Sequence, residues 1–339
     1  MKKLFISMLA VAAMVSCSKE QTVVMPEGEL IGFNSFVENS TRAAAADVTD
    51  PSYSTTTGKG VALEAFNVYG AVNGVNIFNG NLVEKTADYG SAWTLTGASQ
   101  YWINGADYEF VAVVDGNKTV KDSNDNDVVI TSTAINASGI PTAITYNSDG
   151  ATDLLCARVV RANNTDTTVV PFTFSHLLSK VKFSVKNTTD AAATNYRIVL
   201  TEAKITGALA SNTYKVGATS AWDTVNTTDN TKVFAFENLT VNSAAIQFHP
   251  TELLLLPGVN VNVIVKAEVQ ATDDGGKNWT PVSTMNKSFE NVLGTGTLVA
   301  NNAYHFAVSL GIGEEIKFTA TTMPEWVDGD GADDTTLTL

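Results

Sequence analysis

The sequence predicts an all-β protein built from two β-sandwich domains in series. Apolar residues recur at every second position in many short stretches, and almost none recur at helical spacing. Clusters of Asn, Asp and Gly separate these stretches, as in β-hairpins. The chain has 339 residues, of which 44% are hydrophobic and 17% are charged. It can therefore bury one or two large cores, and its many short strands are too numerous for one sandwich.

The N-terminus has the pattern of an export signal. Lys2 and Lys3 precede the apolar run Leu4–Val15, which is too short to span a bilayer as a helix. Small residues then lead directly to Cys17, as at the sites where a lipoprotein signal peptidase cuts. We therefore expect residues 1–16 to be a lipoprotein signal peptide that directs export, and Cys17 to carry a lipid. The alternative is ordinary cleavage nearby, with an incidental thiol at Cys17.

Alternation defines the expected strands in chain order. Ile31, Phe33, Ser35 and Val37 share one face of the first strand. A later strand alternates apolar residues with Lys180, Lys182, Ser184 and Lys186, which predicts one dry and one wet face. The apolar residues of that strand are Val181, Phe183 and Val185. Similar alternation occurs at Val261–Val269, Phe306–Leu310 and Ile316–Ala320. We expect these strands to pair antiparallel and to stack as sheets.

Turn-forming clusters and one polar stretch divide the chain. The polar stretch Arg161–Thr168 is interpreted as the joint between an N-terminal sandwich, residues 43–167, and a C-terminal sandwich, residues 168–339. The expected turns are at Asn73-Gly74, Asn79-Gly80, Asn104-Gly105, Asp115-Gly116-Asn117 and Asp273–Gly276.

Charge and cysteine content narrow the function classes. The net charge is −14, from 21 basic and 35 acidic residues, and the basic residues form no patch. This balance argues against nucleic acid as a partner. Once Cys17 is modified, Cys156 is the one remaining thiol, so no disulfide is expected. Its apolar neighbours favour a small buried side chain over a nucleophile.

No catalytic or metal-binding motif stands out. His176, His249 and His305 belong to none of the common catalytic patterns, and nothing singles out a carboxylate pair for glycoside hydrolysis. The pairs Asp273-Asp274 and Asp333-Asp334 are expected to cap turns. The acidic stretches Asp122–Asp127 and Asp328–Asp333 lack the spacing of a calcium loop. We therefore expect neither enzymatic activity nor a metal or other cofactor.

Three short stretches carry a family resemblance. Leu30–Phe33 followed by Thr41-Arg42-Ala43 is similar to a first strand that ends in a processing site. Tyr101–Asn104 and the aromatic strand Tyr108–Val113 resemble a Tyr-Trp turn and its strand, although Ile103 stands where Pro is usual. The third stretch is Asp153–Leu155 followed by Phe172–Val181. Together they resemble the fimbrillins, the type V pilin subunits of surface fimbriae.

The resemblance implies two transthyretin-like sandwiches and a mechanism of assembly. The lipidated precursor would pass through the periplasm to the outer membrane. An arginine-specific protease would then cut between Arg42 and Ala43 and remove the lipidated propeptide, residues 17–42. Its first strand, with Ile31, Phe33 and Val37, would leave an open groove. A strand from another pilin subunit, of the same or a different kind, would fill that groove and build a fimbria that supports adhesion. The alternative for Arg42 is an accessible site for any trypsin-like protease.

The donor strand is expected near the C-terminus. One candidate alternates through Ile316, Phe318 and Ala320, and the other is Thr335–Leu339, with Leu337 and Leu339 on one face. The breaker-rich passage Pro324–Gly331 between them could act as a linker. Head-to-tail exchange does not close, so it would give filaments. Alternatively, both segments close the second sandwich.

A different function shares the signal peptide and the strand content. A monomeric glycan-binding lipoprotein of the outer membrane would stack sugars on exposed aromatic rings. Arg42 and the terminal strand distinguish a pilin from a glycan binder. A glycan binder has no use for the proteolytic loss of its first strand, and it should stay monomeric after a cut. The candidate rings are Trp93, Tyr101, Trp102, Trp222, Trp279 and Trp326.

Overall fold

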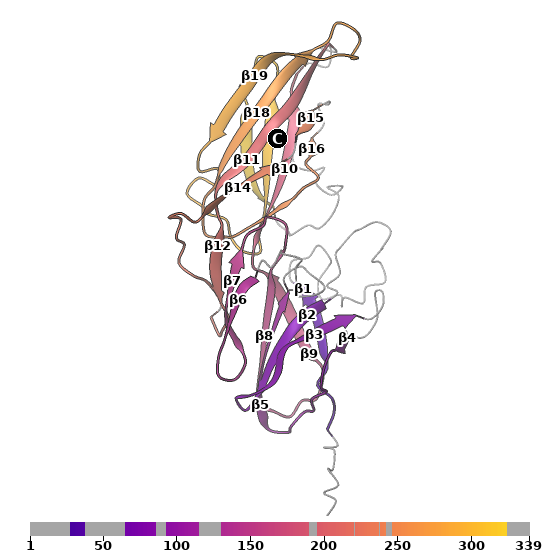
Figure 1. The fold of residues 1–339 in the computed structure, drawn as a ribbon, viewed down its shortest axis with the longest axis vertical. Coiled ribbons are helices and arrows are strands. Elements are labelled where there is room, and N and C mark those ends of the chain that lie inside the picture. The colour runs from indigo at the N-terminus through magenta and orange to yellow at the C-terminus, as the bar shows by residue number, and fades with distance from the viewer. Residues whose placement is uncertain are drawn as a thin grey trace, which may run out of the picture.

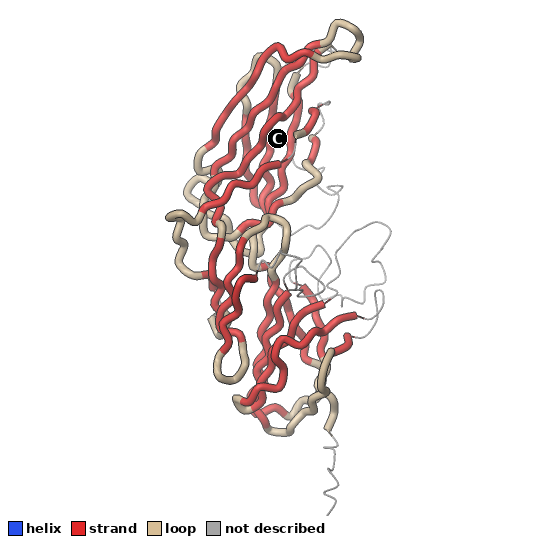
Figure 2. The backbone as a smooth tube through the Cα atoms, in the orientation of Figure 1, coloured by secondary structure: helices blue, strands red, loops and turns tan. Residues whose placement is uncertain are grey.

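The described part of the chain consists of strands, turns and loops, which confirms the prediction of an all-β protein (Figure 2). None of its residues forms a helix that is long and apolar enough to span a membrane. The computed structural model describes residues 28–37, 65–85, 93–114, 130–189, 195–219, 221–236, 238–241 and 246–323.

The largest sheet has seven strands in the order β1-β9-β8-β5-β2-β3-β4. Figure 1 shows it at one end of the long axis of the molecule. Its strands are β1 (Phe33–Val37), β2 (Ala65–Val72), β3 (Val75–Lys85), β4 (Trp93–Leu95), β5 (Ala106–Val114), β8 (Leu155–Asn164) and β9 (Val170–His176).

A small four-stranded sheet lies next along the molecule, in the order β13-β12-β7-β6. Figure 1 shows β6, β7 and β12 between the seven-stranded sheet and the C-terminal strands. Its strands are β6 (Ile130–Ile135), β7 (Pro141–Asn147), β12 (Ser211–Lys215) and β13 (Ala221–Trp222).

Two five-stranded sheets form the C-terminal part. In one, β16, β10, β20 and β21 follow in order and β17 also pairs with β10. In the other, the order is β14, β11, β18 and β19, and β15 also pairs with β11. The rings of Phe183 and Phe236 stack between the sheets with centroids 4.7 Å apart. The strands are β10 (Ser179–Asn187), β11 (Tyr196–Leu209), β14 (Thr231–Phe236), β15 (Leu239–Val241), β16 (Gln247–Phe248), β17 (Leu253–Leu255), β18 (Asn262–Ala271), β19 (Thr280–Phe289), β20 (Ala303–Leu310) and β21 (Lys317–Met323).

Two strand pairs are parallel, so the expectation of purely antiparallel pairing was wrong. Strand β1 pairs parallel with β9, and β10 pairs parallel with β20. The strands of each pair are far apart in the sequence, and alternation sets which face is buried without setting the direction of the neighbouring strand. The remaining strand pairs among the described residues are antiparallel, as expected.

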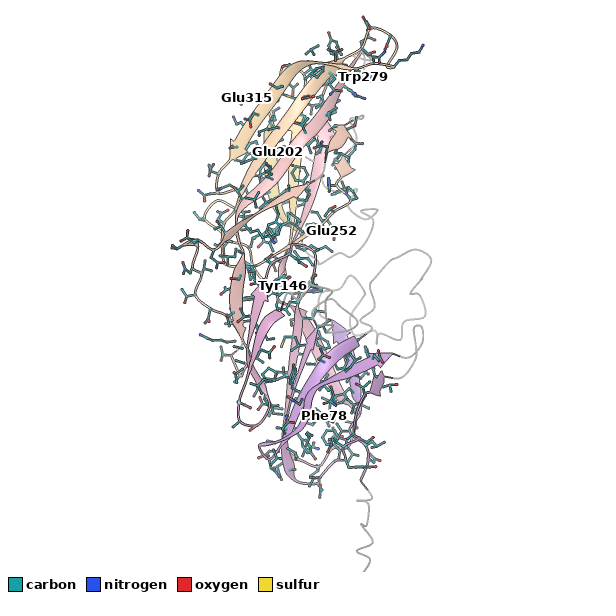
Figure 3. All side chains as sticks on the ribbon, in the orientation of Figure 1. Phe78, Tyr146, Glu202, Glu252, Trp279 and Glu315 are labelled. Atoms are coloured by element: carbon teal, nitrogen blue, oxygen red, sulfur yellow. The ribbon has the colours of Figure 1, made fainter. Side chains whose placement is uncertain are left out.

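Two hydrophobic clusters fill the structure. One lies within the seven-stranded sheet and is rich in aromatic rings, among them Phe78, which Figure 3 labels. The other begins on the opposite face of that sheet, at Val111 and Val113 of β5. It continues through Ile144 and Tyr146 of β7 into the C-terminal sandwich (Figure 3). The second cluster therefore runs from the seven-stranded sheet into the C-terminal sandwich, and the aromatic cluster is separate from it.

Strand pairing also crosses the division expected from the sequence. Strand β12 belongs to the C-terminal half of the chain, yet it extends the β6–β7 hairpin. Arg161–Thr168 includes the end of β8 and the connection to β9, and these two strands pair in one sheet. The stretch therefore connects neighbouring strands. The division into residues 43–167 and 168–339 stays a prediction.

The turn signals have mixed outcomes. Asn73 and Gly74 both have positive φ, at 48° and 77°, and form the two-residue turn between β2 and β3, as predicted. Asn79-Gly80 was expected to be a turn, but it lies inside β3, where the register with β2 shifts as in a β-bulge. Gly80 has φ of 74° there, so the same residue preference serves a bulge. Asp115-Gly116-Asn117 lies outside the described residues.

The prediction that one face of β10 is exposed to solvent was also wrong. Lys180 and Lys182 are only 2% and 3% exposed, and Ser184 is fully buried. The Lys180 and Lys182 ammonium groups lie 2.8 and 3.4 Å from the carboxylate oxygens of Glu252. Buried ammonium groups need such a partner, because desolvation of a lone charge is costly. Alternation identified the two faces of β10 correctly, but pairing with Glu252 allows the polar face to be buried as well.

Candidate functional site

The candidate site is the first strand, β1, and the surface beneath it. Strand β1 lies at the edge of the seven-stranded sheet, where five of its residues pair in parallel register with β9, from Phe33 with Val170 to Val37 with Phe174. Just before β1, the Ile31 N–H donates to the Gln100 carbonyl (2.9 Å), and the Trp102 N–H donates to the Glu29 carbonyl (3.0 Å). Strand β9 and the connection between β4 and β5 thus hold this short segment by its backbone.

Strand β1 and the residues just before it also supply side chains to the aromatic core. Ile31 and Phe33 are 5% and 6% exposed. The Phe33 ring lies 5.5 Å from Phe78, 5.9 Å from Phe110 and 5.7 Å from Phe172, measured between centroids. Burial of side chains of this size stabilises a fold by about 1.5 to 3 kcal/mol each. Strand β1 therefore lies at the edge of the sheet, yet its Phe33 side chain reaches the middle of the aromatic core and acts as an anchor for the strand.

The surface under β1 can be described from the residues that Phe33 contacts. Phe78, Phe110 and Phe172 come from β3, β5 and β9, and each is at most 1% exposed with β1 in place. Without β1, their rings would form an apolar groove beside the unpaired edge of β9. An open edge next to an apolar groove favours the addition of another strand. The parallel β1–β9 ladder is slightly less stable per residue than an antiparallel one, which lowers the cost of replacing it.

The sequence pointed to β1 but not to the walls of this groove. Phe110 and Phe172 lie in stretches identified by alternation and resemblance, whereas Phe78 follows a hairpin that gave no functional signal. Which strands meet β1 depends on the sheet order, where residues about 140 positions apart become neighbours, as in Phe33 with Val170. Alternating aromatic residues in several strands could have indicated a shared core.

Several predicted site residues lie outside the described residues. These include the lipidation site Cys17, the processing site between Arg42 and Ala43, and the donor candidates Leu337 and Leu339. The side chain of Val37 is likewise not described, although its backbone closes β1. In the sequence, Arg42 follows the end of β1 by five residues. A cut after Arg42 would therefore leave β1 whole on the released fragment.

The other donor candidates belong to β21 and the residue before it. Strand β21 is the outer strand of its sheet in the described part of the chain and pairs antiparallel with β20 over seven residues. Ile316 is buried, and Phe318 and Ala320 are half-buried. The Phe318 ring contacts Phe289 of β19 at 5.0 Å and Phe306 of β20 at 5.6 Å. These three residues thus help to close the C-terminal sandwich.

The aromatic residues proposed for sugar stacking are mostly engaged within the fold. Trp102 is 6% exposed and packs edge-on against Tyr108. Trp93 is half-buried against Phe66, and the indole N–H of Trp222 donates to the Leu177 carbonyl. The Arg197 guanidinium covers the Trp279 ring at 4.6 Å. Tyr101 is half-buried, and Trp326 lies outside the described residues. The described tryptophans therefore form no open platform.

The histidines and Cys156 occupy structural positions. His176 Nδ1 lies 2.5 Å from an Asp153 carboxylate oxygen, and His305 Nε2 lies 2.7 Å from the Ser184 hydroxyl. His249 Nδ1 accepts a hydrogen bond from the Thr251 N–H. Cys156 is buried, as predicted, and this burial raises the pKa of its thiol to about 12. Among the described residues, no three His, Cys, Asp or Glu side chains are grouped so as to hold a metal ion.

The loop between β18 and β19 contains the acidic turn that the sequence predicted as a cap. The Asp274 carboxylate accepts hydrogen bonds from the Thr272 hydroxyl and from the N–H groups of Lys277 and Asn278. The hydrogen bond from the Asn278 N–H and that from Thr272 contribute most to lowering the pKa of Asp274 to about 2. The carboxylate therefore caps a turn, as expected.

Comparisons with known proteins agree with the strand architecture. The sequence profile of the fimbrillin-like family matches residues 40–326. A fimbrial protein from Bacteroides vulgatus has a similar structure, with a TM-score of 0.60 at 15% identity, and the match covers 88% of this chain and 99% of that one. A protein from Bacteroides uniformis, described as a cell adhesion protein, has a TM-score of 0.50 at 15% identity, over 88% and 98% of the two chains.

A protein from Bacteroides ovatus that is also described as a cell adhesion protein gives a TM-score of 0.50 at 14% identity, over 89% of this chain and 99% of that one. No protein with a curated description matches the sequence. At these identities the solved structures show a shared fold. The family profile covers most of the chain, so this protein belongs to the fimbrillin-like family.

Proposed function

We propose that this protein is a structural subunit of a cell-surface fimbria that supports adhesion. In this proposal it is exported through the periplasm as a lipoprotein precursor, held at the outer membrane by a lipid on Cys17, and cut between Arg42 and Ala43 by an arginine-specific protease. Strand β1 then leaves with the propeptide, residues 17–42. A strand from another pilin subunit takes its place, and repetition of this step builds the filament.

One observation carries the proposal. Strand β1 is an edge strand that places Phe33 among three buried rings, and Arg42 follows it closely in the sequence. Cleavage after Arg42 would leave β1 attached to the subunit only by non-covalent contacts. Exchange would restore the same edge pairing and the same apolar contacts, so assembly is driven by completing the fold.

The structure favours Thr335–Leu339 over Ile316–Ala320 as the donor. Withdrawal of β21 would break its seven-residue pairing with β20 and remove the Phe318 ring from Phe289 and Phe306. Donation of β21 to another subunit would therefore destabilise the C-terminal sandwich of the donor. The last five residues come after β21 in the sequence, so donating them would require none of these contacts of β21 to break, and Leu337 and Leu339 have the alternation that a groove-filling strand needs.

The test uses purified lipid-free precursor and an arginine-specific protease. Mass spectrometry should find a new N-terminus at Ala43, and light scattering should then show growing particles that electron microscopy resolves as filaments. The matched control is Arg42→Lys, which keeps the charge but removes the cleavage site, and it should remain monomeric. A cut product that stays a monodisperse monomer would contradict the proposal and favour a glycan-binding lipoprotein.

A further inference from the structure

Ser35 stands out on the core-facing side of β1. It is 3% exposed, on the same face as Ile31 and Phe33, and it lies in register with Phe172 of β9. Its hydroxyl oxygen makes no hydrogen bond to any described residue. The strand that carries the Phe33 anchor therefore also carries an unpaired polar group at the next inward position.

The surroundings of Ser35 explain why this hydroxyl is unfavourable. Phe172 belongs to the aromatic cluster, with ring centroids 5.5 Å from Phe66 and 5.9 Å from Phe174. Moving a hydroxyl from water into such a site without a partner opposes binding, because its hydrogen bonds to water are lost. Nearly all buried polar groups in proteins have partners, so this exception calls for an explanation.

We propose that the groove under β1 contains an apolar subsite beside Phe172, which Ser35 fills poorly and which a strand from a second copy of this chain fills with an apolar side chain. This inference rests on the proposed function. As a consequence, β1 completes the fold of the precursor, and the incoming strand binds the same groove more tightly than β1 does. Ser35 thus determines how readily β1 is released.

The last residues of the chain provide a suitable occupant in their sequence. Leu337 and Leu339 are two positions apart, as Phe33 and Ser35 are, so an extended strand presents both leucines to the same face. A strand docked with Leu337 and Leu339 at the positions of Phe33 and Ser35 would place no hydroxyl against Phe172. Thr338, between them, would face the other side.

The first experiment compares β1 release from cleaved precursors. Wild type and Ser35→Ala are cut with an arginine-specific protease, and the released propeptide fragment is followed by size exclusion and mass spectrometry. We expect Ser35→Ala to release the fragment roughly tenfold more slowly, the size of effect for one unpaired buried hydroxyl. Alanine favours strands no more than serine does, so slower release would not reflect strand propensity. The matched control is Thr173→Ala, which removes a half-buried hydroxyl from β9 and should change release by less than about twofold.

A second measurement does not depend on cleavage. In uncut precursor, Ser35→Ala should raise the urea midpoint of unfolding above that of wild type. A midpoint equal to or below wild type, or fragment release that is as fast or faster, would overturn the subsite. If wild-type precursor is cut and gives no filaments, the proposed function fails, and the same two comparisons still report on Ser35. If filaments form while Ser35→Ala releases its fragment at the wild-type rate, only this inference fails.

Discussion

Two edge strands, β1 and β21, lie near opposite ends of the chain and are held in different ways. Strand β1 pairs in parallel over five residues and buries Phe33 in the aromatic core, and Ile31, just before the strand, is buried there as well. Strand β21 pairs antiparallel over seven residues, and its inward ring, Phe318, is only half-buried. Strand β1 is thus held mainly by its buried side chains, and β21 mainly by its backbone pairing with β20. A strand held by anchors can be replaced by any strand that supplies similar anchors.

The largest expected effect is on β1. Phe33→Ala should destabilise the precursor by about 4 kcal/mol, because it removes a buried ring from contact with three others. Urea unfolding of uncut precursor measures this loss. Asn34→Ala, at a half-buried position on the other face of β1, is the matched control and should cost less than about 1 kcal/mol. Equal losses for the two variants would show that Phe33 is not an anchor.

A smaller effect is expected from the buried charges of the C-terminal sheet. Glu252→Gln should destabilise the protein by about 2 kcal/mol, since Lys180 and Lys182 would lose the carboxylate they share. Calorimetry should find the same loss before and after cleavage, because this contact belongs to the permanent part of the fold. Phe33→Ala, by contrast, should have no effect once β1 is gone. If Glu252→Gln destabilised only the uncut precursor, its contact would not belong to the permanent part of the fold, and the contrast with Phe33→Ala would fail.

The matching substitution in β21 should be milder than the one in β1. Phe318→Ala should cost about 1 to 2 kcal/mol, because the ring is half-buried and the seven-residue pairing remains. Urea unfolding of the Phe318→Ala and Phe33→Ala precursors, measured side by side, compares the two losses of stability directly. Filament yield should stay near the wild-type level if Thr335–Leu339 is the donor. A complete loss of filaments from well-folded Phe318→Ala would transfer the donor role to β21.

The smallest effect is expected in the β18–β19 loop, near Trp279 at the far end of the molecule from the first sheet (Figure 3). The pKa of Asp274 is lowered to about 2 by its hydrogen bonds, so its stabilising contribution is present above about pH 4 and is lost as the pH falls toward 2. The melting temperature of wild type should therefore fall more steeply over this range than that of Asp274→Asn. Parallel pH profiles would contradict the capping role.

Much of the fold could be predicted from local patterns. The alternation of Val263, Val265, Ala267 and Val269 predicted a strand with one buried face, and β18 has this arrangement. Asn73-Gly74 predicted a hairpin because only residues that tolerate positive φ fit its turn. These features depend on interactions within a few residues, which one sequence records directly.

The rest depends on which distant segments meet. Alternation placed Ile31, Phe33 and Ser35 on one face, but neither the parallel partner β9 nor the contact of Phe33 with Phe78 could be predicted from it. The burial of Lys180 and Lys182 likewise depends on Glu252, about 70 residues further along the chain. Sheet order and charge pairing are tertiary properties, so the groove could be described only from the structure.

The central claim is that another strand replaces β1 in the filament. The most direct test is to purify filaments assembled from protease-treated precursor and to measure, by quantitative mass spectrometry, how much of the propeptide they retain. The account predicts chains that begin at Ala43, with residues 17–42 absent or present in only trace amounts. Filaments that retain one copy of residues 28–37 per subunit would show that β1 stays in its groove and would contradict strand exchange.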